Sequence, residues 1–108
     1  MSAAERWLRD HVPGAPPALM DAMVGALAAD AGEPVPEALA AGALSLYRGL
    51  LDTAGGREDA LPLLAADALL THAIQAQAEI DPDTVDAFTR RWGAAGALAL
   101  LSPDAPRA

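Results

Sequence analysis

The sequence predicts an all-α protein: a compact bundle of four main antiparallel helices with one or two short terminal helices. Apolar residues recur at spacings of three and four over most of the chain, which is the period of an amphipathic helix. No segment alternates apolar and polar residues over the length of a strand. Short connectors rich in Pro and Gly separate the apolar segments, so consecutive helices should be antiparallel neighbours. We expect residues 1–101 to form a single helical domain and 102–108 a frayed C-terminal tail.

The first helix is expected over residues 3–11. Ser2 and Glu5 have the spacing of a capping box, in which the Ser hydroxyl accepts a hydrogen bond from the amide three residues later. The prolines of segment 12–17 should end this helix, because proline has no N–H and restricts the residue before it.

The second helix is expected over residues 17–31, with Pro17 in its first turn and Gly32 in a left-handed cap after its end. Its apolar stripe consists of Met20, Met23, Val24 and Leu27. A third helix is expected over residues 36–53, ending before Gly55–Gly56. Its apolar face is wide, which predicts a central position in the bundle. That face consists of Leu39, Ala43, Leu46 and Leu50, with Leu44, Tyr47 and Leu51 beside them.

The fourth helix should be the longest, running from Arg57 or Asp59 to Ile80. Pro62 then falls in the first turn, where a missing N–H removes no hydrogen bond. Its buried side is expected to consist of several alanines with Leu63, Leu64, Leu70 and Ile74.

A fifth helix is expected after the Asp81–Thr84 cap. Its apolar residues are Val85, Phe88 and Trp92, and Arg90 and Arg91 suit its C-terminal end, where cations interact well with the helix dipole. Residues 94–101 are expected to form one more short helix.

Composition excludes several classes of function. The formal net charge is −8, whereas nucleic-acid binding and anionic membrane surfaces require clustered basic residues. The chain has no Cys and no Lys, so it has no disulfide, thiolate metal site, cysteine nucleophile, Schiff-base lysine or P-loop lysine. Alanine makes up about a quarter of the residues. Together with the abundance of Gly, Pro and Arg, this composition is typical of a GC-rich bacterial genome.

Location is expected to be cytoplasmic. Charged residues in the first turns leave no apolar core for a secretory signal, and no window approaches the ~18 apolar residues of a membrane span.

Polar residues at four-residue spacing mark one face of the fourth helix and form the candidate ligand-binding set. The set consists of Asp67, Thr71, His72, Gln75 and Glu79. One hypothesis is a polar pocket in which His72 acts as a base with a carboxylate partner. The other is that these residues form the solvated face of an amphipathic helix.

No metal site or cofactor is expected. His11 and His72 could share a metal ion with a carboxylate only if the fold brought the ends of their helices together, and the sequence contains no HExxH motif. His11 is expected to interact with free carbonyls at the end of its own helix.

Trp7 and Trp92 are the candidate partner-binding residues, because tryptophan is enriched at interfaces as well as in cores. We expect Trp92 to anchor its helix to the core, while Trp7 lies on a short polar helix and fits either role equally.

The leading functional hypothesis is a small non-enzymatic module that binds itself or another protein through an apolar surface. The wide alanine-rich faces of the third and fourth helices support it, because they offer more apolar surface than a core of this size needs. The alternative is a small-molecule-binding protein or minor enzyme using the polar set around His72. A third possibility is an acidic inhibitor of a basic protein.

Overall fold

The computed structural model describes residues 1–28, 32–53, 55–93 and 96–97. Within these ranges the chain is helical and has no strand, which confirms the all-α prediction. The elements in chain order are α1 (Ala3–His11), α2 (Pro17–Gly25), α3 (Val35–Leu50), the 3₁₀ turn η1 (Arg57–Asp59), α4 (Ala60–Ile80), the 3₁₀ turn η2 (Pro82–Thr84) and α5 (Val85–Trp92). The predicted helix over 94–101 and the predicted tail over 102–108 lie largely or wholly outside the described residues.

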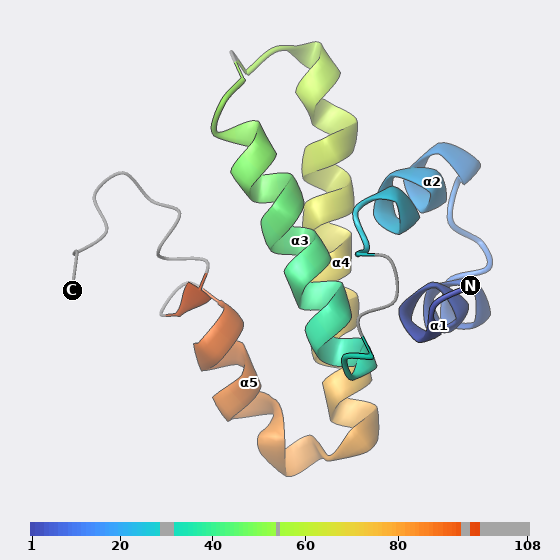
Figure 1. Cartoon of the computed structure of the whole chain (residues 1–108), viewed down its shortest axis with the longest axis vertical. Helices are drawn as coiled ribbons and strands as arrows, with labels where there is room; N and C mark the ends of the chain where they lie inside the picture. The colour runs from blue at the N-terminus through green and yellow to red at the C-terminus, as the bar shows by residue number, and fades with distance from the viewer. Residues whose placement is uncertain (29–31, 54, 94–95, 98–108) are drawn as a thin grey trace.

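The longest helices, α3 and α4, form an antiparallel hairpin, and the short helices pack around it (Figure 1). α1 and α2 lie on one side of the hairpin, and α5 lies on the other. α1, α2 and α5 are all shorter than α3 and α4. The short helices therefore take their positions by packing against the hairpin.

Local sequence sets the ends of several helices as predicted. The Glu5 N–H donates to Ser2 Oγ at 3.1 Å, which caps α1, while the Glu5 carboxylate accepts from Arg9. The Asp83 N–H donates to Asp81 Oδ1 at 3.0 Å and starts η2 ahead of α5. Gly55 takes a φ of +76°, a backbone conformation that favours glycine, in the connection after α3.

The second helix is shorter than predicted. α2 ends at Gly25, and Ala26 and Leu27 continue in turns rather than in the helix expected to residue 31. Glycine weakens a helix at the point where α2 stops, and the turn lets Leu27 pack against Gly42 of α3. Gly32 does take the predicted positive φ, at +66°.

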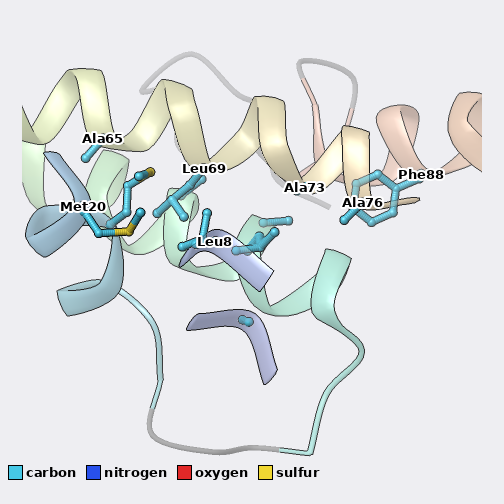
Figure 2. Close-up of a cluster of buried hydrophobic side chains, with 12 residues drawn as sticks. Leu8, Met20, Ala65, Leu69, Ala73, Ala76 and Phe88 are labelled. Carbon is cyan, nitrogen blue, oxygen red and sulfur yellow. The ribbon is translucent and has the colours of Figure 1, made fainter. Parts of the chain in front are cut away.

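The core is built around alanines of α4. Figure 2 shows Ala65, Leu69, Ala73 and Ala76 in a row along this helix, facing side chains from the shorter helices. The facing side chains include Leu8 of α1, Met20 and Met23 of α2, Leu39, Ala40 and Ala43 of α3, and Phe88 of α5. Because alanine is small, α4 approaches its neighbours closely through this row.

The buried side of α4 differs from the predicted one. Leu63 and Leu64, expected in the core, are 47% and 54% exposed, and Leu70 and Ile74 are half-buried. The alanine row determines which side of the helix faces inward, so the two leucines in the first turns of α4 point away from the core.

Candidate functional site

The predicted polar set on α4 lies on an outer face of the helix. Asp67, Thr71, Gln75 and Glu79 are exposed, and His72 is half-buried. Thr71 Oγ1 donates to the Asp67 carbonyl at 3.0 Å, and His72 Nδ1 lies 3.1 Å from the oxygen of Gln75, to which it donates. These two contacts stay within α4.

Asp67 is the acceptor for the hydroxyl of Tyr47, which links α4 to α3. The pKa of Tyr47 is raised above its ordinary value, first by burial and then by the hydrogen bond and the negative charge of Asp67. The neutral phenol is therefore the form that the fold stabilises, and this contact is a structural link between helices rather than a reactive group.

Both histidines lie beside the indole of Trp7, at the edge where α1 approaches α4. The imidazole of His11 stacks on the indole of Trp7, with ring centroids 4.0 Å apart, and His72 contacts the same indole at 6.0 Å. His11 Nε2 lies 3.1 Å from the carboxylate of Glu79. The fold therefore gathers Trp7, His11, His72 and Glu79, although no group of His, Asp and Glu in the described residues is placed to hold a metal ion.

Trp92, the other candidate partner-binding residue, is half-buried against the core beside Phe88. The guanidinium of Arg91 lies over both rings and donates to Glu37 at the start of α3, with 2.8 Å between Nη2 and Oε1. Trp92 thus belongs to the contact that fastens α5 to the hairpin. Trp7 is also half-buried, so neither indole is presented as an open surface.

A cleft of about 420 Å³ lies between the start of α1, the end of α2 and the middle of α3. Small side chains line most of it, including Ala3, Ala41 and Gly42, with Ser2, Ser45 and Glu33 as polar groups. None of the predicted site residues borders this cleft, and among the described residues no polar or charged side chain is buried.

An apolar surface that the sequence analysis did not single out lies at the end of the α3–α4 hairpin. We define the leucine end as Leu51, Leu61, Leu63 and Leu64, which are 56%, 40%, 47% and 54% exposed. The signal was present in the spacing: Leu61 and Leu63 are two residues apart on a helix, which places them about 200° apart around its axis, so one core cannot bury both.

No described helix covers this end. α1, α2 and α5 lie beside the middle and the opposite end of the hairpin (Figure 1). Large exposed apolar residues elsewhere in the described ranges are Met1 and Ile80, which lie far from this group in the chain. The four exposed leucines all lie between residues 51 and 64, so this end of the hairpin is a candidate binding surface.

Comparison with known proteins gives no match: neither a family model, nor a curated protein, nor a solved structure is similar enough to indicate a relationship. Within the described residues no helix combines the length and the apolar character needed to cross a membrane.

Proposed function

We propose that this chain is a small non-enzymatic helical module that binds a protein partner through the leucine end. The observation that carries the proposal is the exposure of Leu51, Leu61, Leu63 and Leu64 at one end of the hairpin. Covering apolar surface contributes about 25 cal/mol per Å², so a partner that covers these side chains gains binding free energy from each of them.

The polar groups of the chain support a binding role over a catalytic one. The hydroxyl of Thr71 and the imidazole of His72 bond within α4, and Asp67 accepts from Tyr47. The first two contacts stay within α4, and the third joins α3 to α4, so each has a structural partner. The net charge of −8 supports a protein partner rather than a nucleic acid, and we retain the cytoplasmic location expected from the sequence.

Site-specific photo-crosslinking tests this function. A photoreactive side chain at Leu64 should give a covalent adduct of one defined mass in living cells, whereas the same group at Gln75, on the exposed polar face of α4, should not. Equal labelling at both positions, or no adduct at Leu64, would contradict a binding role for the leucine end.

A small-ligand site at the edge between α1 and α4 is the second candidate function. It is favoured by the meeting of Trp7, His11, His72 and Glu79, which brings an aromatic ring together with proton donors and acceptors. Titration of the protein with a library of small polar ligands, followed by the NMR signals of the two histidine rings, tests it. A ligand that shifts both rings in the wild type but leaves the remaining His11 ring unshifted in His72→Ala would support this function, and unshifted rings throughout would reject it.

A further inference from the structure

The leucine end is apolar on more than one side. Leu61 and Leu64 are one turn apart and lie on the same side of α4, while Leu63 lies on the far side. Leu51 extends the apolar surface onto the end of α3. A flat strip of partner surface would cover only one of these sides, whereas a second helical hairpin end can place side chains against two.

Charges of both signs surround these leucines. Arg48 and Arg57 are exposed and make no ion pair within the described ranges, unlike Arg9, Arg90 and Arg91, which all do. The carboxylates of Asp52 and Glu58 are likewise exposed and without a described ion pair. Two arginines and two carboxylates are therefore available to a partner at this end.

Charges of opposite sign nearly cancel at this end. Two arginines and three carboxylates, including Asp59, lie between residues 48 and 59, so the segment contributes −1 of the total −8. Two copies that meet through this end bring arginines as well as carboxylates together, so the repulsion between their local charges is small.

We propose that the leucine end binds a second copy of this chain, so that two hairpin ends pack together about a two-fold axis; this inference rests on the proposed function. A two-fold interface places each residue type opposite the same surface on the other copy. The leucines of one copy then cover those of the other, and the free arginines of each meet free carboxylates of its partner. A strongly basic partner would offer few carboxylates to Arg48 and Arg57.

The dimer should be weak and only slightly sensitive to salt. Four half-exposed leucines are far fewer than the roughly 20–30 residues a side of a standard interface, so we expect a dissociation constant in the micromolar range. Added salt screens the repulsion between two acidic chains, but it also screens the attraction between arginines and carboxylates across the interface, so the two effects oppose each other. A complex with a strongly basic protein would instead weaken steeply as salt is added.

Sedimentation velocity of the full chain over a range of concentrations tests the proposal. We expect the wild type to shift from the 11.0 kDa monomer toward twice that mass as its concentration rises. Leu61→Gln with Leu64→Gln should weaken association at least tenfold and leave the net charge unchanged. The matched control is Ile80→Gln, because Ile80 is 65% exposed at the opposite end of α4. Circular dichroism establishes that each variant remains helical.

Charge reversal identifies the partner more strictly. Arg48→Glu with Arg57→Glu should abolish self-association, and so should Asp52→Arg with Glu58→Arg. An equal mixture of these two double variants should form a heterodimer, because each then supplies the charges that the other lacks.

A wild type that stays monomeric at high concentration overturns the proposal, and so does an Ile80→Gln variant that dissociates as readily as the leucine variant. The proposed function has a separate readout. If the crosslink at Leu64 captures a different protein while the purified chain is monomeric, the binding function stands and self-association fails. If Leu64 gives no adduct and the chain is monomeric, both fail.

Discussion

His11 reaches from the last turn of α1 to Glu79 near the end of α4, with 3.1 Å between Nε2 and the carboxylate oxygen. Its other nitrogen, Nδ1, lies 2.9 Å from the carbonyl oxygen of Trp7. Both partners are acceptors, so the ring satisfies both contacts when each nitrogen carries a proton. His11 makes the predicted contact with a carbonyl of its own helix. It also contacts α4, which the spacing of residues in the sequence could not reveal.

Replacing His11 by Ala should loosen α1 from α4. The exposed pair with Glu79 is worth up to about 1 kcal/mol, so we expect faster hydrogen exchange at the α1 amides with little change in global stability. Arg9→Ala is the control, because the Arg9–Glu5 pair lies within α1 and makes no link to α4. Equal acceleration in both variants would show that His11 acts only within its helix.

Tyr47 should make the stability of the fold fall in alkaline solution. Its folded-state pKa lies above the unfolded value near 10, so the stabilisation is complete below pH ~10 and is lost as the pH rises further. The chain has a single Tyr and no Lys or Cys, so no other side chain titrates in that range. Urea unfolding of the wild type and Tyr47→Phe at about pH 8 and pH 11 measures the effect. A decline of equal size in both proteins would exclude Tyr47 as its source.

Two glycines of α3 should respond oppositely to alanine. At Gly49 an added Cβ meets nothing within 4 Å, so Gly49→Ala should gain up to about 1 kcal/mol from helix propensity. At Gly42 the Cβ would lie 3.2 Å from Leu27 Cδ2 and 3.3 Å from Leu69 Cδ1, and Leu69 is fully buried. Overpacking there costs about 1–3 kcal/mol, so Gly42→Ala should be the less stable variant by at least about 1 kcal/mol. Equal stability in thermal unfolding would show that Leu27 and Leu69 move aside for the extra methyl group.

Asp59 should hold the connection between α3 and α4. Its Oδ2 accepts from the Thr53 hydroxyl at 2.6 Å and from the Gly55 N–H at 3.0 Å. Asp59→Ala should therefore lower the free energy of unfolding by about 1 kcal/mol. Asp52→Ala provides the comparison, because the Asp52 side chain makes no described hydrogen bond or ion pair. If both variants lost the same free energy of unfolding, the cause would be a general charge effect at this end of the hairpin.

The helices followed from the sequence because their signals are local. Ser2 capped α1 as its spacing indicated, Pro62 fell in the first turn of α4, and Gly32 took a positive φ. The early end of α2 could not be predicted from local signals, because it involves a contact between Leu27, in the turn after the helix, and Gly42 of α3.

The exposure of the leucine end was harder to predict, because hydrophobicity does not say which of two apolar sides of a helix is buried. The apolar character of Leu63 and Leu64 predicts that they lie in the core, but the alanine row faces inward and these two leucines are exposed. The polar set around His72 was recognised as a helix face, yet its partners Trp7 and His11 lie more than 60 residues away in the chain and could not be paired with it from spacing.

The alanine row of α4 also affects how the hairpin keeps its alignment. Ala65, Ala73 and Ala76 present nearly identical methyl groups, so sliding α4 past α3 by one turn would change the shape of the contact very little. The alignment of α3 and α4 must then be specified by unlike residues: Leu69 against Gly42, and Tyr47 with Asp67. A small number of contacts between unlike residues therefore selects one alignment of α3 and α4 among several that would pack similarly. Substitutions that remove these contacts should allow the two helices to shift.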